Sequence, residues 1–461
     1  MIGRLGLRIS AVFRATAPDP FVVAVLLTLL TFVLAFTLTD TEPSAVVDHW
    51  GGSSGVWSLL GFGMQMCLIL VTGHALASSP PVSAVLNRLA ALPRTGAQAG
   101  ALIAFVACTL SVCNWGLGLI AGALLAKRVG EEMERRGRPA HYPLLAAAGY
   151  LGFIVWHGGF SGSAPLKVTT ARGLTDIFGE SPPIETIDLS QTLLSPLNLV
   201  VTGGLIIMVP LLVMALSPRD ERDMQSMGSF GVAPEEPPSK PADEEPSPFL
   251  PRLLEDTPLV TLALVGLIGW WAWRFYVPRT DHASGIFDLN PDSVNLTMLL
   301  LGLICHGTPR RYVRAVERAA ASCAGIILQF PLYAGIMAVM KTSGLTSMLA
   351  EAIAANATPQ TLPVFTFLSA GIVNLFVPSG GGQWAVQGPI AMQAAIDAGV
   401  SPAKMVMAVA YGDQLTNMLQ PFWALPVLAI TGVKARDIVG YTALVMVVAS
   451  AWVVLWLVLV P

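Results

Sequence analysis

The chain has 461 residues, of which 54% are hydrophobic and 12% are charged, and its formal net charge is −3. A soluble globular protein carries about a quarter charged residues, so this composition excludes an ordinary soluble domain and indicates a protein embedded in a lipid bilayer. The nearly balanced charge gives no reason to expect a nucleic-acid partner.

Simple membrane spans account for much of the chain. Arg4, Arg8 and Arg14 precede the first apolar run, and no convincing small-residue cleavage site follows it. We therefore expect a cytoplasmic amphipathic lead-in and a retained first helix. Apolar runs of about 17 to 25 residues can cross a bilayer as helices. Candidate runs lie at 20–38, 58–78, 193–215, 257–276, 293–306, 323–342 and 437–459.

Four further apolar segments are interrupted. The segments 97–127 and 361–397 are too long for one crossing and are broken in the middle, which predicts re-entrant helical hairpins. The segments 143–175 and 403–430 contain Gly, Ser and Pro in mid-run, which predicts broken transmembrane helices. The fold class is therefore an all-α polytopic membrane protein.

The interrupted segments occur twice in the same order, about 260 residues apart. Tyr150 is followed by Pro165 at the same interval at which Tyr411 is followed by Pro426. Paired broken helices in two halves are typical of transporters whose site lies between two repeats.

We expect a first repeat at 1–216 and a second at 253–461. The segment 217–252 between them is rich in Pro, Glu and Ser, which predicts a flexible cytoplasmic linker.

Basic residues indicate the orientation of the repeats, because Lys and Arg concentrate in cytoplasmic loops. An arrangement with the N-terminus and five loops inside places 20 of the 26 basic residues there. Those loops are 79–96, 127–141, 216–252, 306–322 and 431–436. This arrangement requires the two hairpins to enter from opposite sides, so the repeats are predicted to have inverted topology.

The hairpin tips and the helix breaks are the predicted substrate site. Irregular backbone at membrane depth persists only where protein or an aqueous cavity covers it, and free N–H groups at a helix start suit a small carboxylate. The predicted substrate-binding residues are Asn114, Trp115 and Gly116 at the first tip, Ser379, Gly380, Gly381, Gly382, Gln383 and Trp384 at the second, and Ser161, Ser163, Asn417 and Gln420 at the breaks. The alternative is that these small and polar residues only support close helix packing and helix-to-helix hydrogen bonds.

Asp413 and His157 are the predicted coupling residues. An ionised carboxylate in mid-membrane costs on the order of 3 kcal/mol, so such residues usually have a function. A charged Asp413 would repel a carboxylate substrate, and a proton or Na⁺ would remove that repulsion. Histidine as a residue type is suited to a proton relay near neutral pH, which makes His157 a candidate. The alternatives are a structural acid and a packed, hydrogen-bonded histidine.

The five cysteines, Cys67, Cys108, Cys113, Cys305 and Cys323, lie in or beside apolar runs and show no metal-type spacing. We expect no metal site and no cofactor other than the coupling H⁺ or Na⁺.

Several motifs resemble the bacterial short-chain fatty acid transporter family, which is associated with acetoacetate and butyrate uptake. The matching stretches are Leu60-Gly61-Phe62-Gly63-Met64-Gln65-Met66, Val71-Thr72-Gly73-His74-Ala75-Leu76-Ala77-Ser78-Ser79, Gly158-Gly159-Phe160-Ser161-Gly162-Ser163, Val377-Pro378-Ser379-Gly380-Gly381-Gly382 and Gln420-Pro421-Phe422-Trp423-Ala424-Leu425-Pro426. The resemblance implies secondary uptake of short monocarboxylates. Through a wider ion-transporter superfamily, it also implies a homodimer in which a mobile domain carries the site across a fixed scaffold.

The sequence therefore predicts a cation-coupled, multi-pass transporter of short-chain fatty acids in the bacterial inner membrane, not an enzyme. The predicted site residues include no Arg, which favours a monocarboxylate over a dicarboxylate. One alternative is a transporter of another organic anion. The others are a passive channel and an intramembrane hydrolase that uses Ser161, His157 and Asp413. Ser161 lies four positions after His157, which is compatible with one helix face, but Gly158, Gly159 and Gly162 argue against an intact helix there.

Overall fold

The computed structural model describes residues 2–178, 182, 184–231, 248–278, 290–354 and 357–460. Within these ranges the chain is helical and contains no strand. Eight of the described helical segments are long and apolar enough to cross a membrane. The prediction of an all-α, multi-pass membrane protein is thereby confirmed. Part of the predicted linker, residues 232–247, lies outside the described ranges.

Eleven helices form the first half of the described chain. They are α1 Ile2–Thr16, α2 Pro20–Leu38, α3 Pro43–Gly51, α4 Leu60–Ser78, α5 Pro80–Ala91, α6 Gly96–Cys113, α7 Trp115–Arg135, α8 Tyr142–Tyr150, α9 Ser163–Lys167, α10 Ala171–Phe178 and α11 Pro196–Leu216.

Eleven more form the second half. They are α12 Phe249–Glu255, α13 Leu259–Tyr276, α14 Pro291–His306, α15 Pro309–Ala320, α16 Ala324–Thr342, α17 Leu345–Ala354, α18 Leu362–Phe376, α19 Gly380–Ala398, α20 Pro402–Thr416, α21 Pro421–Thr431 and α22 Ala435–Leu459. Proline stands in the first turn of many of them, where its missing N–H would have no helical partner anyway.

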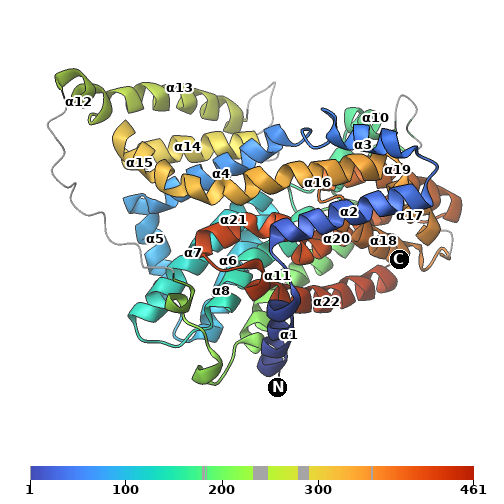
Figure 1. Cartoon of the computed structure of the whole chain (residues 1–461), viewed down its shortest axis with the longest axis horizontal. Helices are drawn as coiled ribbons and strands as arrows, with labels where there is room; N and C mark the ends of the chain where they lie inside the picture. Colours follow the sequence, from blue (N-terminus) through green and yellow to red (C-terminus); the bar gives the residue numbers. More distant parts are fainter. Residues whose placement is uncertain are drawn as a thin grey trace.

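The helices form two groups (Figure 1). The first group contains α2, α3, α4 and α13 to α16, in which α4 packs on α14 and α15, and α16 packs on α2, α3 and α4. The second group contains α6 to α11 and α18 to α22, in which α6 packs on α7 and α11, and α20 packs on α18 and α19. Contacts of α4 with α7 and of α16 with α21 join the two groups.

Each predicted hairpin is a pair of helices that meet at a short non-helical tip. The first pair is α6 and α7, separated only by Asn114, and the second is α18 and α19, separated by Val377, Pro378 and Ser379. Helices α6 and α7 lie toward one end of the molecule, and α18 and α19 lie toward the other (Figure 1).

Both predicted broken helices are interrupted. After α8 the chain forms two short 3-10 turns, Leu151–Ile154 and Trp156–Gly158, before α9 resumes at Ser163. After α20 a single turn, Asn417–Leu419, precedes α21.

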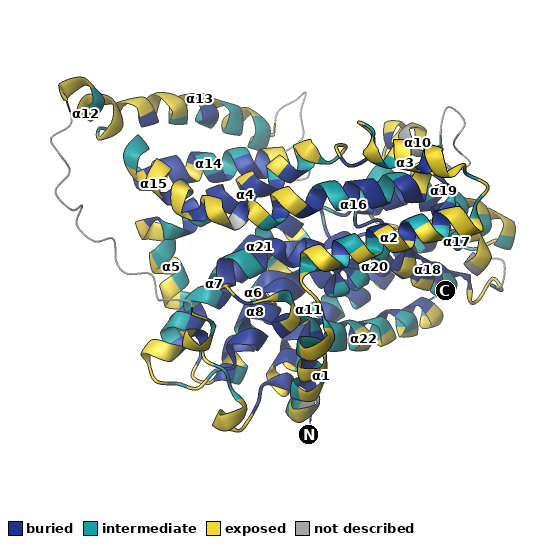
Figure 2. Ribbon diagram, viewed as in Figure 1, coloured by how far each residue is buried: buried dark blue, intermediate teal, exposed yellow. Residues whose placement is uncertain are grey.

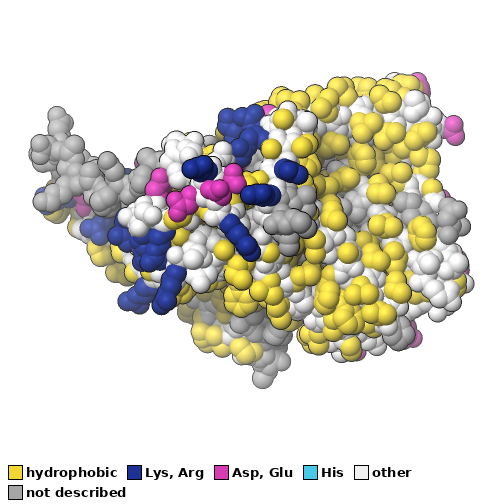
Figure 3. Space-filling view, turned by 90° about the horizontal axis from the view of Figure 1, so that it is seen from below, with side chains coloured by type: hydrophobic (Ala, Val, Ile, Leu, Met, Phe, Trp, Pro, Cys, Tyr) yellow, Lys and Arg dark blue, Asp and Glu magenta, His cyan; other side chains and the backbone are white. Residues whose placement is uncertain are grey.

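The interrupted segments are the most deeply buried part of the chain (Figure 2). Every residue of α8 is buried, and so are most residues of α20. Helices α2, α11, α13 and α22 instead expose many large apolar side chains. Figure 3 shows this apolar surface beside a region in which Lys and Arg gather toward one end of the molecule. A helix that is apolar on all sides is expected either in a protein core, as α8 is, or facing lipid, as the exposed apolar side chains of α2 and α13 indicate.

Candidate functional site

A cavity of about 760 Å³ lies between the two helix groups. Phe62 and Gln65 of α4 and Asn290 at the start of α14 line it from the first group. Both hairpin tips and the first helix break line it from the second group. The volume lies within the usual range of small-molecule sites, roughly 300 to 1,000 Å³.

The tip of the first hairpin is held by side-chain caps. Asn114 Oδ1 accepts hydrogen bonds from the backbone N–H groups of Gly116 at 3.0 Å and Leu117 at 3.1 Å. The N–H of Trp115 donates to Ser161 Oγ at 3.0 Å. The first N–H groups of α7 are therefore satisfied within the protein, as helix starts require.

The tip of the second hairpin is more open. Ser379 Oγ accepts from the N–H of Gly382 at 3.2 Å, and Ser379, Gly380 and Gly381 all line the cavity. A Cβ on Gly380 would lie 2.6 Å from Trp156 Cη2, 2.9 Å from His157 Cε1 and 3.0 Å from Asp413 Oδ2. Only glycine fits this close approach between the second tip and the first helix break.

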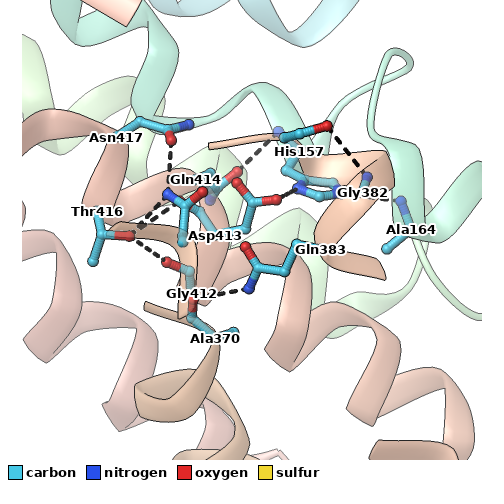
Figure 4. Close-up of polar contacts among 12 residues, drawn as sticks. His157, Ala164, Ala370, Gly382, Gln383, Gly412, Asp413, Gln414, Thr416 and Asn417 are labelled. Carbon is cyan, nitrogen blue, oxygen red and sulfur yellow. Dashed lines mark hydrogen bonds and ion pairs between the residues drawn. The ribbon is translucent and has the colours of Figure 1, made fainter. Parts of the chain in front are cut away.

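His157 and Asp413 form a fully buried pair directly behind this tip (Figure 4). His157 Nδ1 lies 3.1 Å from Asp413 Oδ2, and the N–H of Ala164 donates to His157 Nε2 at 3.0 Å. Because Nε2 accepts a hydrogen bond, the proton of the neutral imidazole resides on Nδ1, facing the carboxylate.

Gln414 supports the first break from the other half of the chain. Its Oε1 accepts from the N–H groups of His157 at 3.0 Å and Gly158 at 3.1 Å (Figure 4). Asn198 of α11 donates to the carbonyl of Gly158 at 2.9 Å. These bonds satisfy backbone groups that neither water nor a regular helix could satisfy there.

The two tyrosines that share a sequence interval make reciprocal contacts. Tyr150 of the first half donates to the carbonyl of Asn417, at the second break, over 2.6 Å. Tyr411 of the second half donates to Asn198 Oδ1 over 3.0 Å, and Asn198 binds the first break. Each half thus holds the interruption of the other.

The second break has its own amide network. Asn374 Nδ2 donates to the carbonyl of Asp413 at 2.7 Å and to Asn417 Oδ1 at 2.8 Å, while Gln420 Nε2 donates to the carbonyl of Asn374. Gln383 Nε2 donates to the carbonyl of Ala370 at 2.8 Å.

The structure divides the predicted substrate residues into two sets. Those that line the cavity are Trp115, Ser161, Ser163, Ser379, Gly380 and Gly381. Those that are not among its lining residues are Asn114, Gly116, Gly382, Gln383, Trp384, Asn417 and Gln420. Of these, Trp384 is fully buried in a packed core, and Gln420 lines a separate cavity of about 310 Å³.

Sequence reasoning missed several residues of the cavity. Lys167 of α9 and Arg172 of α10 place two cations in its wall, although the predicted site contained no Arg. Both lie inside the segment 143–175 that was expected to carry the site, so their position in the sequence could have revealed them.

The aromatic wall of the cavity was also larger than expected. Trp423 lies 5.4 Å from Trp115, 5.0 Å from Phe153 and 6.1 Å from Phe62, measured between ring centroids. These four rings form one apolar surface that includes only one predicted residue, Trp115.

Eight apolar spans and a cavity between two helix groups define the chain as a multi-pass membrane protein. The sequence model of a family described as "Short chain fatty acid transporter" matches residues 1–460. The chain belongs to this family, and the resemblance drawn from its motifs is confirmed.

Two relatives, each provisionally named a short-chain fatty acid transporter, are similar over nearly their whole length. The one from Escherichia coli K12 is 42% identical over 443 residues, covering 96% of both chains. The one from Haemophilus influenzae is 39% identical over 449 residues, covering 96% of this chain and 97% of its own.

Two solved structures are more distantly similar. The YdaH transporter of Alcanivorax borkumensis has 19% sequence identity and a TM-score of 0.44, and covers 96% of this chain and 97% of its own. MtrF of Neisseria gonorrhoeae has 15% identity and a TM-score of 0.36, and covers 98% and 96%.

Proposed function

We propose that the chain is a secondary active transporter that takes up short-chain fatty acids, such as butyrate and acetoacetate, together with H⁺ or Na⁺. The observation that carries this proposal is the cavity between the two helix groups, with the buried His157–Asp413 pair directly behind its Gly380 wall. Family membership supports the substrate class.

The cavity offers separate surfaces for the two parts of such a substrate. The start of α19 at Ser379 to Gly381, together with Lys167 and Arg172, suits the carboxylate. The rings of Trp115 and Trp423 suit a short acyl chain, because apolar contact there replaces contact with water.

Asp413 is the proposed coupling residue, with His157 as its positioning partner. A substrate carboxylate at the α19 tip would lie close to a buried carboxylate, since Gly380 touches both. Like charges in a poorly solvated site repel strongly, so binding favours an Asp413 that has gained a proton or a neighbouring cation.

The arrangement of the two helix groups supports an elevator movement. In this movement the second group, which contains both tips, would carry the site past the first group, which contributes only one wall of the cavity. The reciprocal Tyr150 and Tyr411 contacts support inverted repeats. The proposal includes re-entrant tips, a homodimer, the bacterial inner membrane and a cytoplasmic N-terminus.

Proteoliposome transport tests the proposal directly. Purified protein should accumulate labelled butyrate when an inward proton or sodium gradient is imposed, with each gradient tested separately and protein-free vesicles as the control. Counter-flow of preloaded butyrate should also occur, since a carrier exchanges substrate and a channel does not. Uptake that only equilibrates and shows no counter-flow would reject a coupled carrier.

Lys167 and Arg172 favour one second candidate, a transporter of a larger or doubly charged organic anion. Inhibition of labelled butyrate uptake by an excess of succinate would support this second candidate.

The hydrolase alternative has no support in the geometry, because His157 Nε2 faces the N–H of Ala164 and Ser161 Oγ accepts a hydrogen bond from the N–H of Trp115. A catalytic pair would need the serine hydroxyl within reach of that nitrogen.

A further inference from the structure

A second polar cavity, of about 540 Å³, lies between α1 and the end of α11, far in sequence from the site described above. Four charged side chains line it: Arg4 of α1, and Arg219, Asp220 and Asp223 of the segment after α11. Leu7 and Ala215 supply apolar lining. Figure 3, which views the molecule from below, shows basic and acidic side chains mixed toward one end, beside a broad apolar surface.

The charges of this cavity do not neutralise one another. None of the four side chains forms an ion pair with any residue in the described ranges. Asp220 Oδ1 accepts only a backbone N–H, that of Arg222, at 3.2 Å. Two cations and two anions that line one cavity without pairing are complementary to a ligand that carries both signs.

The cavity is held in place by tight packing of α1. A Cβ on Gly3 would lie 3.0 Å from the carbonyl oxygen of Ser217, and one on Gly6 would lie 3.1 Å from both Leu216 and Tyr441. Arg14 Nε lies 3.0 Å from Asp437 Oδ1 of α22. The backbone of Arg4 is thereby held beside the end of α11, and the side chain of Arg4 is exposed.

An exposed apolar stripe leads to the cavity along α11. Ile207, Leu211 and Met214 are 64%, 56% and 41% exposed and lie on one face of the helix, with Ala215 of the cavity at its end. The C-terminal end of α11 carries partial negative charge, which favours a cation there.

We propose that this cavity binds the headgroup of a phospholipid that carries a phosphate and a primary ammonium, as phosphatidylethanolamine does. The phosphate binds Arg4 and Arg219, the ammonium binds Asp220 and Asp223, and an acyl chain follows the α11 stripe. Arginine suits phosphate because its planar fork donates several hydrogen bonds. This cavity shares no lining residue with the cavity between the two helix groups.

Lipid retention by the full-length protein tests the proposal. The protein, purified in detergent, is equilibrated with equal amounts of phosphatidylethanolamine and phosphatidylglycerol, and bound lipids are counted by native mass spectrometry. We expect at least fivefold more phosphatidylethanolamine than phosphatidylglycerol on the wild type. The trimethylated headgroup of phosphatidylcholine, which has no N–H donors, should also be retained less.

Two double variants test the two halves of the site separately. Arg4→Gln/Arg219→Gln and Asp220→Asn/Asp223→Asn should each lower retained phosphatidylethanolamine at least fivefold. The control for the arginine variant is Arg8→Gln/Arg222→Gln, which removes the same two positive charges from neighbouring positions that do not line the cavity. Equal retention of all three lipids, or an equal loss in the control, would reduce the site to general lipid contact and overturn the proposal. If only the arginine variant retained less phosphatidylethanolamine, the proposal that the site binds both the phosphate and the ammonium would be overturned.

Discussion

Gly380 offers the sharpest test of the site, because it touches the cavity and the His157–Asp413 pair together. In Gly380→Ala the new methyl would lie within 3.0 Å of Trp156, His157 and Asp413, so the α19 tip or the pair must move. Inserting a methyl group into a closely packed site costs about 1 to 3 kcal/mol.

The expected decrease in the rate of uptake follows from this free-energy cost. If the strain opposes the transport-competent packing of the tip, the initial rate of uptake falls about 5- to 150-fold, at 1.4 kcal/mol per factor of ten. Gly381→Ala is the matched control. Gly381 is the next residue and also lines the cavity, but its added methyl would meet only Ser163, with Oγ the nearest atom at 3.8 Å. Because the methyl added in Gly381→Ala makes only an ordinary van der Waals contact, we expect this variant to lower the rate less than Gly380→Ala does.

The assay is the initial rate of labelled butyrate uptake into proteoliposomes at matched protein content. The melting temperature in detergent is measured in parallel to show that both variants fold. Trp156→Phe removes the nearest clashing atom, so combining it with Gly380→Ala should restore part of the rate. Equal rates for the two alanine variants would refute the close packing of the second tip against the pair.

Four further outcomes follow from the structure. Asp413→Asn should abolish accumulation against a gradient but leave butyrate exchange; unchanged accumulation would remove its coupling role. Arg172 occupies an exposed position in the cavity wall, and Arg172→Gln should raise the KM for butyrate about two- to fivefold at low salt. The increase in KM should be smaller at high salt, and Arg172→Lys should return the KM to the wild-type value. Gln414→Leu leaves two buried N–H groups without an acceptor, which costs about 2 to 6 kcal/mol; a melting temperature equal to wild type would contradict this. Burial, and then the charge of Arg14, lower the pKa of His141 from 6.5 to about 4. The unfolded state therefore binds the proton first, so stability should fall as the pH drops from about 6.5 toward 4, by at most about 3 kcal/mol. The slope of melting temperature against pH should flatten in His141→Asn.

The helix breaks could be predicted from the sequence because lipid cannot form hydrogen bonds with the N–H and C=O groups of an irregular backbone. A run such as 143–175, with its Gly-Gly and Ser-Gly-Ser, cannot remain a regular lipid-facing helix, so the break is visible in the residue types alone. The structure interrupts this segment, and places the loss of regular helix between Tyr150 and Ser163.

The roles of individual polar residues were much harder to predict. Asn114 looked like a ligand from its place at a tip, yet its side-chain oxygen caps α7. Gln414 stands beside Asp413 in the sequence, and only the folded chain shows that it supports His157 and Gly158. The residue type shows that a buried polar side chain needs a hydrogen-bond partner. It does not show whether a backbone group or a substrate is that partner.

The sequence alone determined the membrane environment, the helical class, the segments that are interrupted and the family. These follow from hydropathy, backbone hydrogen-bonding and motifs that are local in the chain. Tertiary structure alone decided which residues share the cavity and which support them, because the decisive contacts join residues far apart in the chain. His157 meets Asp413, and Gly380 packs against both, only after the two halves have folded together.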